Sequence, residues 1–194
     1  MGGGTIPHRD LFATYLNYVY TSTLATSELS KDQISKLNQT QFTQHIGKEY
    51  LSLAVLYVLG ERLQDTKFKN LIVDTIVGLA SMISPAKTWI APDRAMITII
   101  YEGTPESSQA RRLIADLSTG YTLDSMKSFL GFRLEDYPRH FLRDLVIAVR
   151  KEASIKINPA KRDGPSAYYE TTKDAQDATP LLNCGPSNGV PEKS

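Results

Sequence analysis

Histidine and cysteine, the side chains that most often bind metals or act as nucleophiles, are rare in this chain of 194 residues. Its three histidines are His8, His45 and His140, which lie far apart in the sequence. None belongs to a cluster of three or four cysteine, histidine or carboxylate residues at the spacing of metal ligands. Zinc needs three or four ligands that converge on one point. We therefore expect no metal site and no cofactor.

The remaining candidates for catalysis are one cysteine and a few carboxylates. Cys184 lies near the C-terminus, and its sequence context places no histidine to activate it. Glu135 and Asp136 are neighbours in the chain, whereas acid–base catalysis needs convergent groups with shifted pKa values. The sequence contains neither a Gly-x-Ser-x-Gly nucleophile turn nor a phosphate-binding glycine loop. We expect a protein that is not an enzyme.

Composition narrows the choice of partners. The formal net charge is +1, so no strong field attracts nucleic acid or an anionic membrane. A single cysteine excludes an internal disulfide, which is typical of a reducing compartment. No apolar run is long enough for a membrane span, and the N-terminus lacks the pattern of a signal peptide. These features predict a cytoplasmic or nuclear protein without nucleic-acid or membrane partners.

Arg111 and Arg112 form the clearest basic doublet. A pair of arginines beside a helix more often makes surface ion pairs than phosphate contacts. Glu106 and Asp116 lie close enough in the sequence to be the partners. We expect surface ion pairs here.

The spacing of apolar residues predicts an all-α fold of about six or seven helices. Residues 10–20 have helical spacing, whereas residues 21–44 are polar and are expected to form a loop. Residues 46–63 are apolar on nearly every face, which predicts a central helix buried on most sides. Residues 66–83 repeat every three or four positions. Either Asp65 or Thr66 is expected to cap this helix, which would pack antiparallel to the central one.

In the second half of the chain, the spacing of apolar residues and the helix-start signals predict shorter helices. Residues 92–101 favour a helix opened by a proline, with a β-strand as the alternative because β-branched residues are frequent. Thr104 and Pro105 are expected to start the next helix, and residues 122–130 a further short one. The last helix, after Pro138, has an apolar stripe of Phe141, Leu142, Leu145, Val146 and Val149.

Both ends of the chain are expected to lack a packed structure. Residues 1–8 are predicted to be a flexible N-terminus. Residues 155–194 contain repeated X-Pro breaks and few apolar residues, which predicts a disordered tail.

Four blocks of sequence, in the same order, resemble fungal BTB/POZ domain proteins. Residues 57–65 read YVLGERLQD and residues 68–74 read FKNLIVD, where that family commonly has YVLGEKLQD and FKNAVID. Residues 11–21 are similar to the family's FELYVQWLYTG, although Ser22 replaces its glycine. Residues 100–116 and 137–145 resemble its IYENTPEGSPLRRLLVD and LPKEFLLDL segments.

The resemblance implies a non-catalytic protein-interaction module, in the manner of an adaptor. Residues 9–84 would be part of a BTB/POZ domain, and residues 85–154 a helical extension that follows it. A complete domain begins with strands that precede this region, so we expect an N-terminally truncated domain of marginal solubility. Family members bind a second copy of themselves or a cullin-type scaffold, which are the partners expected here.

Loss of those strands would expose apolar side chains that they normally cover. We expect the contact surface for a protein partner to include Leu11, Tyr15, Leu51, Val55 and Leu59. Two alternatives remain open at this stage. One is a helix-turn-helix protein whose helix after Asp65 reads nucleic acid, although only Lys67 and Lys69 make its start basic. The other is a truncated remnant without function.

Overall fold

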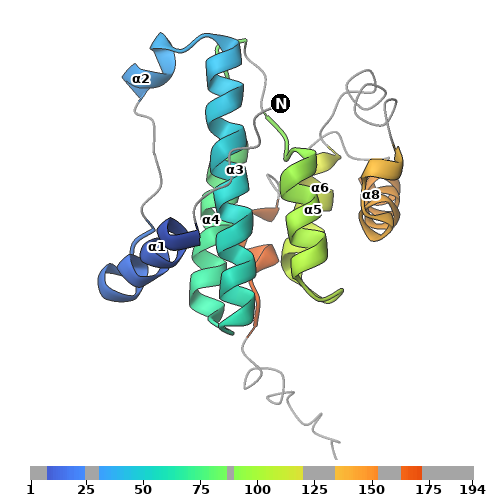
Figure 1. Cartoon of the computed structure of the whole chain (residues 1–194). Helices are drawn as coiled ribbons and strands as arrows, with labels where there is room; N and C mark the ends of the chain where they lie inside the picture. The colour runs from blue at the N-terminus through green and yellow to red at the C-terminus, as the bar shows by residue number, and fades with distance from the viewer. Residues whose placement is uncertain (1–7, 25–30, 87–89, 120–133, 153–162, 172–194) are drawn as a thin grey trace, which may run out of the picture.

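A computed structural model describes residues 8–24, 31–86, 90–119, 134–152 and 163–171. These residues form seven α-helices and two short 3-10 helices, and the described part of the chain contains no strand. The predicted all-α fold is therefore confirmed. Figure 1 shows a long central helix with the other helices arranged around it.

The N-terminal half contains α1 (His8–Thr21), α2 (Lys31–Lys36) and α3 (Gln39–Arg62). The predicted helix at residues 10–20 is confirmed, but the predicted loop at 21–44 is wrong over α2 and the start of α3. Asn38 caps α3: its side chain accepts from the Gln41 backbone N–H at 2.9 Å, and its own N–H donates to the Gln41 side chain at 3.0 Å. Polar residues therefore begin the central helix here instead of forming a loop.

Helix α4 (Thr66–Ser81) runs back along α3 after a short turn, as predicted (Figure 1). Asp65 is its N-cap and accepts from the Phe68 backbone N–H at 2.9 Å. The two helices bury most of their facing side chains, which confirms the central position of α3. The largest fully buried members of this pair are Phe42, Ile46, Tyr50, Leu53, Tyr57, Phe68, Ile72 and Ile76.

Helices α5 (Arg94–Gly103) and α6 (Gln109–Ser118) follow. Residues 94–101, predicted as helix with strand as the alternative, are helical. The predicted opening of this helix by Pro92 is wrong, because Asp93 is the N-cap and the helix begins at Arg94. The predicted start of the next helix at Thr104 is wrong, because Ser108 caps α6. The Thr104 hydroxyl instead donates to the Ile100 carbonyl at 2.6 Å, at the end of α5.

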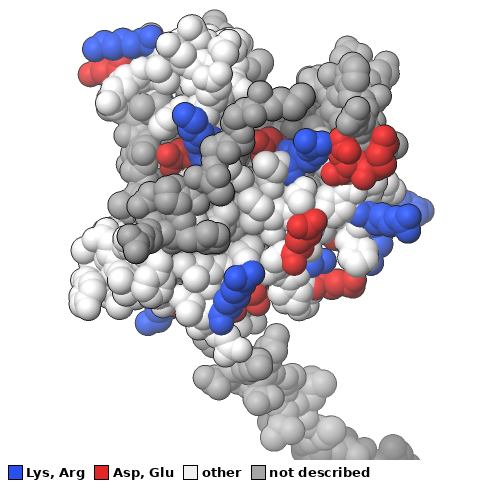
Figure 2. Space-filling view, in the orientation of Figure 1, with Lys and Arg blue, Asp and Glu red and all other residues white. Residues whose placement is uncertain are grey.

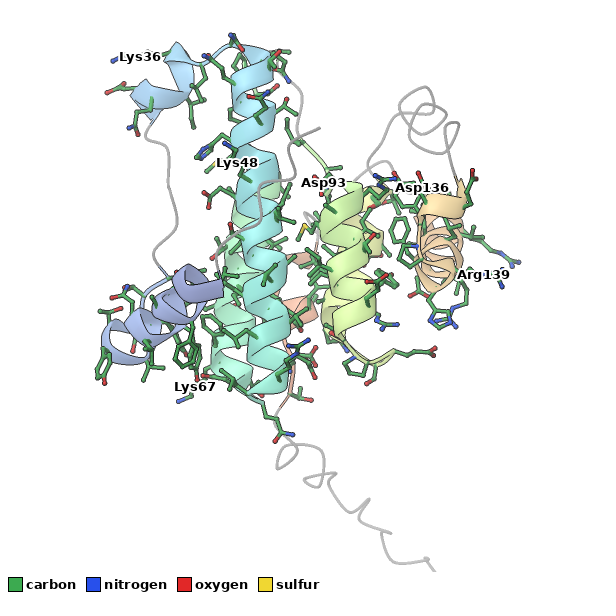
Figure 3. The ribbon with its side chains drawn as sticks, viewed as in Figure 1. Lys36, Lys48, Lys67, Asp93, Asp136 and Arg139 are labelled. Carbon is green, nitrogen blue, oxygen red and sulfur yellow. The ribbon has the colours of Figure 1, made fainter. Side chains whose placement is uncertain are left out.

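Helix α8 (Arg139–Glu152) packs against α6 and follows the 3-10 helix η1 (Leu134–Asp136). An ion pair of 2.6 Å between Arg94 and Asp136 joins η1 to the start of α5. Figure 3 labels Asp136 and the α5 N-cap Asp93. Phe141 and Leu145 are buried as predicted, but Val146 is 67% exposed and faces solvent. The predicted stripe was therefore too wide. The short helix predicted at residues 122–130 lies outside the described residues.

The predicted tail is wrong over residues 163–171. Here η2 (Pro165–Tyr168) and the residues after it pack against α4 and α6, and the Tyr168 side chain has no exposed surface. Figure 1 shows this segment in orange, between α4 and the α5–α6 pair. The remaining tail positions, and residues 1–7 of the predicted flexible N-terminus, lie outside the described residues.

The arginine doublet divides between surface and core. Arg112 is exposed and lies 3.7 Å from Asp116, as predicted. Arg111 is buried, so the predicted surface pair is wrong for it. Its guanidinium donates to the carbonyls of Tyr101 and Thr104 and to the Thr104 hydroxyl. Because those carbonyls end α5, the cation also interacts favourably with the helix dipole.

Candidate protein-interaction groove

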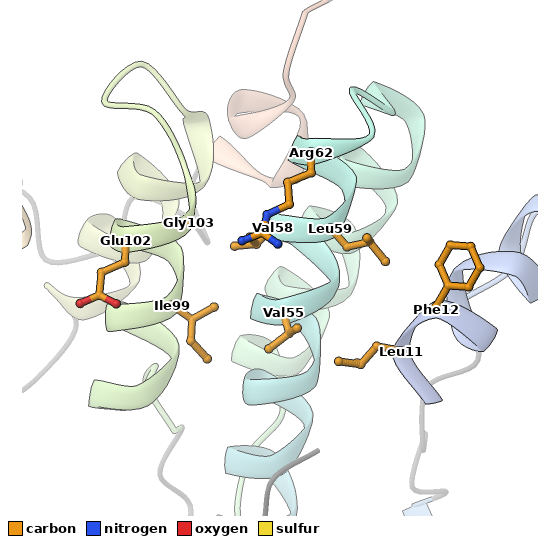
Figure 4. Close-up of a pocket in the computed structure, with 9 residues that line it drawn as sticks. All are labelled: Leu11, Phe12, Val55, Val58, Leu59, Arg62, Ile99, Glu102 and Gly103. Carbon is orange, nitrogen blue, oxygen red and sulfur yellow. The ribbon is translucent and has the colours of Figure 1, made fainter. Parts of the chain in front are cut away.

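A hollow lined by some of the predicted contact residues runs along one side of α3. It has a cavity volume of about 470 Å³. Figure 4 shows α3 in the middle, α1 on one side and α5 on the other, with aliphatic side chains facing the gaps between them. We call this feature the α1–α3–α5 groove; its lining residues are Leu11, Phe12, Val55, Val58, Leu59, Arg62, Ile99, Glu102 and Gly103.

Three of the five predicted contact residues, Leu11, Val55 and Leu59, line this groove. Val55 and Leu59 are half-buried, whereas Leu11 is buried by packing within the core. The other two predicted residues are not brought to it. Leu51 is half-buried elsewhere on α3. Tyr15 turns toward α4, where its ring meets that of Phe68 edge-on at 5.0 Å.

The far wall of the groove, formed by α5, was not anticipated from the sequence. Gly103 ends this helix, and a Cβ atom placed there would lie 2.4 Å from Cγ2 of Val58. Real side chains do not approach so closely, so glycine is required for α5 to cross α3 at this point. The close crossing brings Ile99 and Glu102 to the groove.

Two charged residues border the otherwise apolar groove. Arg62 comes from the last turn of α3 and Glu102 from α5, and both are exposed. Within the described ranges, neither forms an ion pair. The groove therefore offers one positive and one negative group beside an apolar surface.

An exposed apolar strip on α1 continues the groove outward. Phe12, which lines the groove, is 50% exposed, and Tyr20 at the other end of the helix is 86% exposed. Leu16 and Val19 lie between them and are also exposed. Figure 2 shows few charged side chains over α1, at the lower left, compared with the region over α5 and α8. A contiguous apolar surface of this kind marks an interaction site or an aggregation risk.

The residues considered for chemistry stay apart. Within the described residues, no three His, Cys, Asp or Glu side chains are placed to hold a metal ion. His140 lies 3.3 Å from Glu106 at the surface, His45 is half-buried on α3, and Cys184 is outside the described part of the chain. Among the described helices, not one combines the length and apolar character needed to cross a bilayer.

The titratable groups with the largest shifts are tyrosines outside the groove. Burial is the main cause, and it raises the pKa of Tyr57, Tyr101 and Tyr168. Neighbouring carboxylates, Asp144 for Tyr101 and Asp116 for Tyr168, raise these pKa values further. Such phenols stay protonated at neutral pH and serve as hydrogen-bond donors, so they do not supply a general base.

The helix that a DNA-binding protein would use is poorly placed for that task. Lys69 is buried and its ammonium lies 2.9 Å from a Glu61 carboxylate oxygen. Of the two lysines at the start of α4, only Lys67 is exposed, at the edge of the molecule (Figure 3). One exposed lysine provides little attraction for phosphate.

Comparison with known proteins adds no relative. The chain matches no family model, no curated protein and no solved structure. The BTB/POZ resemblance therefore stays a prediction from the four sequence blocks. The groove, in contrast, follows directly from the described residues.

Proposed function

We propose that this chain is a non-catalytic protein-interaction module of BTB/POZ ancestry, and that its α1–α3–α5 groove binds an amphipathic helix of a partner protein. The observation that carries the proposal is the convergence of Leu11, Val55 and Leu59 on one groove. These residues were expected at a contact surface on the basis of sequence alone. They come from two helices, α1 and α3, and Leu11 lies 44 positions before Val55 in the chain.

The shape and lining of the groove favour a helix as the occupant. Its volume of about 470 Å³ accommodates several side chains, and six of its nine lining residues are aliphatic or aromatic. An apolar groove between helices is a common receptor for the apolar face of a helix, which inserts residues spaced three or four positions apart. The exposed strip of α1 would extend the contact beyond the groove.

The charges at the groove specify the partner further. Arg62 would pair with an acidic residue of the bound helix, and Glu102 with a basic one. Charge pairs at the rim of an interface contribute mainly to orientation and specificity. The expected occupant is thus a helix with an apolar face flanked by one acidic and one basic position.

Site-specific photo-crosslinking in cells tests this proposal. The photoreactive amino acid p-benzoylphenylalanine replaces Phe12, which lines the groove and is similar in shape. The matched control carries it at Val146, an exposed apolar residue of α8 that lies outside both the groove and the α1 strip. We expect the Phe12 position to crosslink to one partner segment with helical apolar spacing, in clear excess over Val146. Equal crosslinking at both positions would contradict the proposal.

The crosslinked segment also distinguishes the two partner classes expected from the family. A segment of this same chain would indicate self-association, and a cullin-type scaffold would indicate an adaptor of ubiquitin ligases. A nucleic-acid crosslink at Phe12 would favour the alternative function of a helix-turn-helix protein.

A further inference from the structure

The carboxylate of Glu170 lies in a site built from two other segments of the chain. One of its oxygens accepts hydrogen bonds from the Tyr57 hydroxyl at 2.7 Å, the Ser108 hydroxyl at 3.1 Å and the Gln109 backbone N–H at 2.9 Å. Tyr57 comes from the buried side of α3, while Ser108 and Gln109 form the start of α6. Hydrogen bonds to a charged acceptor are the stronger kind.

The two tyrosines before Glu170 occupy sites of their own. The Tyr168 ring is fully buried, with the Arg112 guanidinium 5.1 Å from its centre, and its hydroxyl donates to Asp116 at 2.7 Å. The Tyr169 hydroxyl donates to Asp74 on α4. Each of three consecutive side chains thus meets a polar partner suited to its chemistry.

The main chain of the same segment is recognised as well. The Glu170 N–H donates to the Asn70 side-chain carbonyl at 2.8 Å, and the Asn70 amide donates to the Glu170 carbonyl at 3.3 Å. A side-chain amide that binds both groups of one residue fixes the position of an extended peptide, because it replaces the contacts of a neighbouring strand. This pair holds the peptide independently of side-chain identity.

These contacts have the character of peptide recognition. A buried aromatic ring and a half-buried, hydrogen-bonded carboxylate provide specificity, and Asn70 provides register. The contacts join residues that are 52 to 113 positions apart in the chain. Within the described residues, they attach one short segment, residues 168–170, to a face formed by helices α3, α4 and α6. Such a segment behaves as a ligand that happens to belong to the same chain.

We propose that the face formed by α3, α4 and α6 is a recognition site for a Tyr-Tyr-Glu peptide motif, occupied here by residues 168–170 and open to the same motif from another polypeptide. Attachment to the same chain gives the internal motif a high effective concentration. An external peptide therefore competes only when the internal motif is weakened. This site is separate from the α1–α3–α5 groove, so the two proposals stand or fall independently.

The test uses the full chain with its internal motif weakened by Tyr168→Ala and Glu170→Gln. The probe is a fluorescent peptide of the sequence DGPSAYYET, which corresponds to residues 163–171, and binding is followed by fluorescence anisotropy. We expect saturable binding to this variant and at least tenfold weaker binding to the wild-type chain. A variant that is helical by circular dichroism and does not bind the peptide would overturn the proposal.

Two matched controls make the readout specific to the motif. A peptide with the Glu170→Gln substitution should bind about tenfold more weakly, because it loses the charge-assisted hydrogen bonds. Adding Asn70→Ala to the variant chain should weaken binding of the original peptide similarly. Equal affinity for both peptides, or no effect of Asn70→Ala, would show that the face does not read the motif.

If the double variant does not fold, the same binding measurement is made with the chain that carries Glu170→Gln alone. This substitution keeps the shape of the side chain and the buried Tyr168 ring. Its affinity for the peptide should exceed that of the wild-type chain at least threefold. Wild-type affinity in this variant would count against an exchangeable site.

Discussion

Val58 and Gly103 lie so close that α5 packs against α3 only because position 103 has no side chain. A Cβ atom there would lie 2.4 Å from one Val58 methyl carbon and 2.7 Å from the other. Val58 is β-branched and buried, so its methyl groups cannot move aside easily. This contact determines how far α5 stands from α3, and with it the width of the groove.

Gly103→Ala should therefore destabilise the protein by about 1–3 kcal/mol, the usual cost of overpacking. The measurement is the free energy of unfolding in urea, followed by circular dichroism. Val58→Ala removes the two methyl groups that clash. The destabilisation of the double variant should be smaller than the sum of the two single-variant values by about 1 kcal/mol or more, because the substitutions share one contact. Strict additivity would show that the helices do not depend on this approach.

Arg111 is the buried cation that joins α5 to α6. Its guanidinium meets the Tyr101 carbonyl at 2.7 Å and lies over the Tyr101 ring at 5.1 Å, while one terminal nitrogen has no hydrogen-bond partner within the described residues. Arg111→Lys should cost at least about 2 kcal/mol, since a lysine ammonium cannot reproduce the planar set of donors. The exposed Arg139→Lys serves as control and should change stability by less than about 0.5 kcal/mol. Similar values for both would contradict the role of Arg111.

Stability should fall as the pH rises above about 10, the ordinary pKa of tyrosine. Burial raises the pKa of Tyr57 and Tyr101 in the folded chain, so the folded state keeps these protons after the unfolded state has lost them. The contribution of these tyrosines to the free energy of unfolding is fully present below pH 10 and is lost as the pH rises toward their pKa in the folded state. Each such tyrosine contributes a slope of up to about 1.4 kcal/mol per pH unit. Urea unfolding at several pH values between 8 and 11 measures it.

The control for this pH dependence is Tyr57→Phe, which removes one of the titrating groups. Its slope above pH 10 should be shallower than that of the wild-type chain. A slope that does not change would assign the alkaline loss of stability to other groups.

Ser22 has a backbone conformation that favours glycine. Its φ is 57°, and its N–H donates to the Tyr18 carbonyl at 2.7 Å, so it ends α1 in the left-handed region. The BTB/POZ segment that resembles this helix has a glycine at the same place. Ser22→Gly should stabilise the protein by up to about 1 kcal/mol, whereas Ser22→Val should destabilise it. Thermal melts of the two variants should therefore shift in opposite directions. A shift in the same direction would show that the left-handed conformation at Ser22 does not limit stability.

Local patterns predicted the long helices, since apolar spacing depends only on neighbouring residues. The six residues of α2 carry too few apolar positions to show such a period. Thr104 and Ser108 are both suitable caps, and the choice between them was decided by Arg111, which binds the Thr104 hydroxyl and both carbonyls at the end of α5. The sequence pattern alone could not reveal that tertiary contact.

The same distinction applies to the two candidate sites. Leu11, Val55 and Leu59 were predicted because they are apolar residues on the helices that the resemblance marks as exposed. The α5 wall depends on how closely Gly103 lets two helices approach, which no periodicity encodes. The docking of Glu170 depends on partners 61 to 113 positions away in the chain. Glu170 itself lies in a stretch of glycines, prolines and polar residues, which is typical of a tail.

The role of the α1–α3–α5 groove as the partner site is tested by the yield of the Phe12 photo-crosslink in two further variants. Leu59→Arg places a charge in the groove at a half-buried position, and Ile83→Arg places the same charge at an exposed apolar position outside the lining. Both chains are first checked for unchanged helicity and cooperative melting. We predict that Leu59→Arg abolishes the crosslink and that Ile83→Arg preserves it. A crosslink that survives Leu59→Arg in a folded chain would contradict the α1–α3–α5 groove as the partner site.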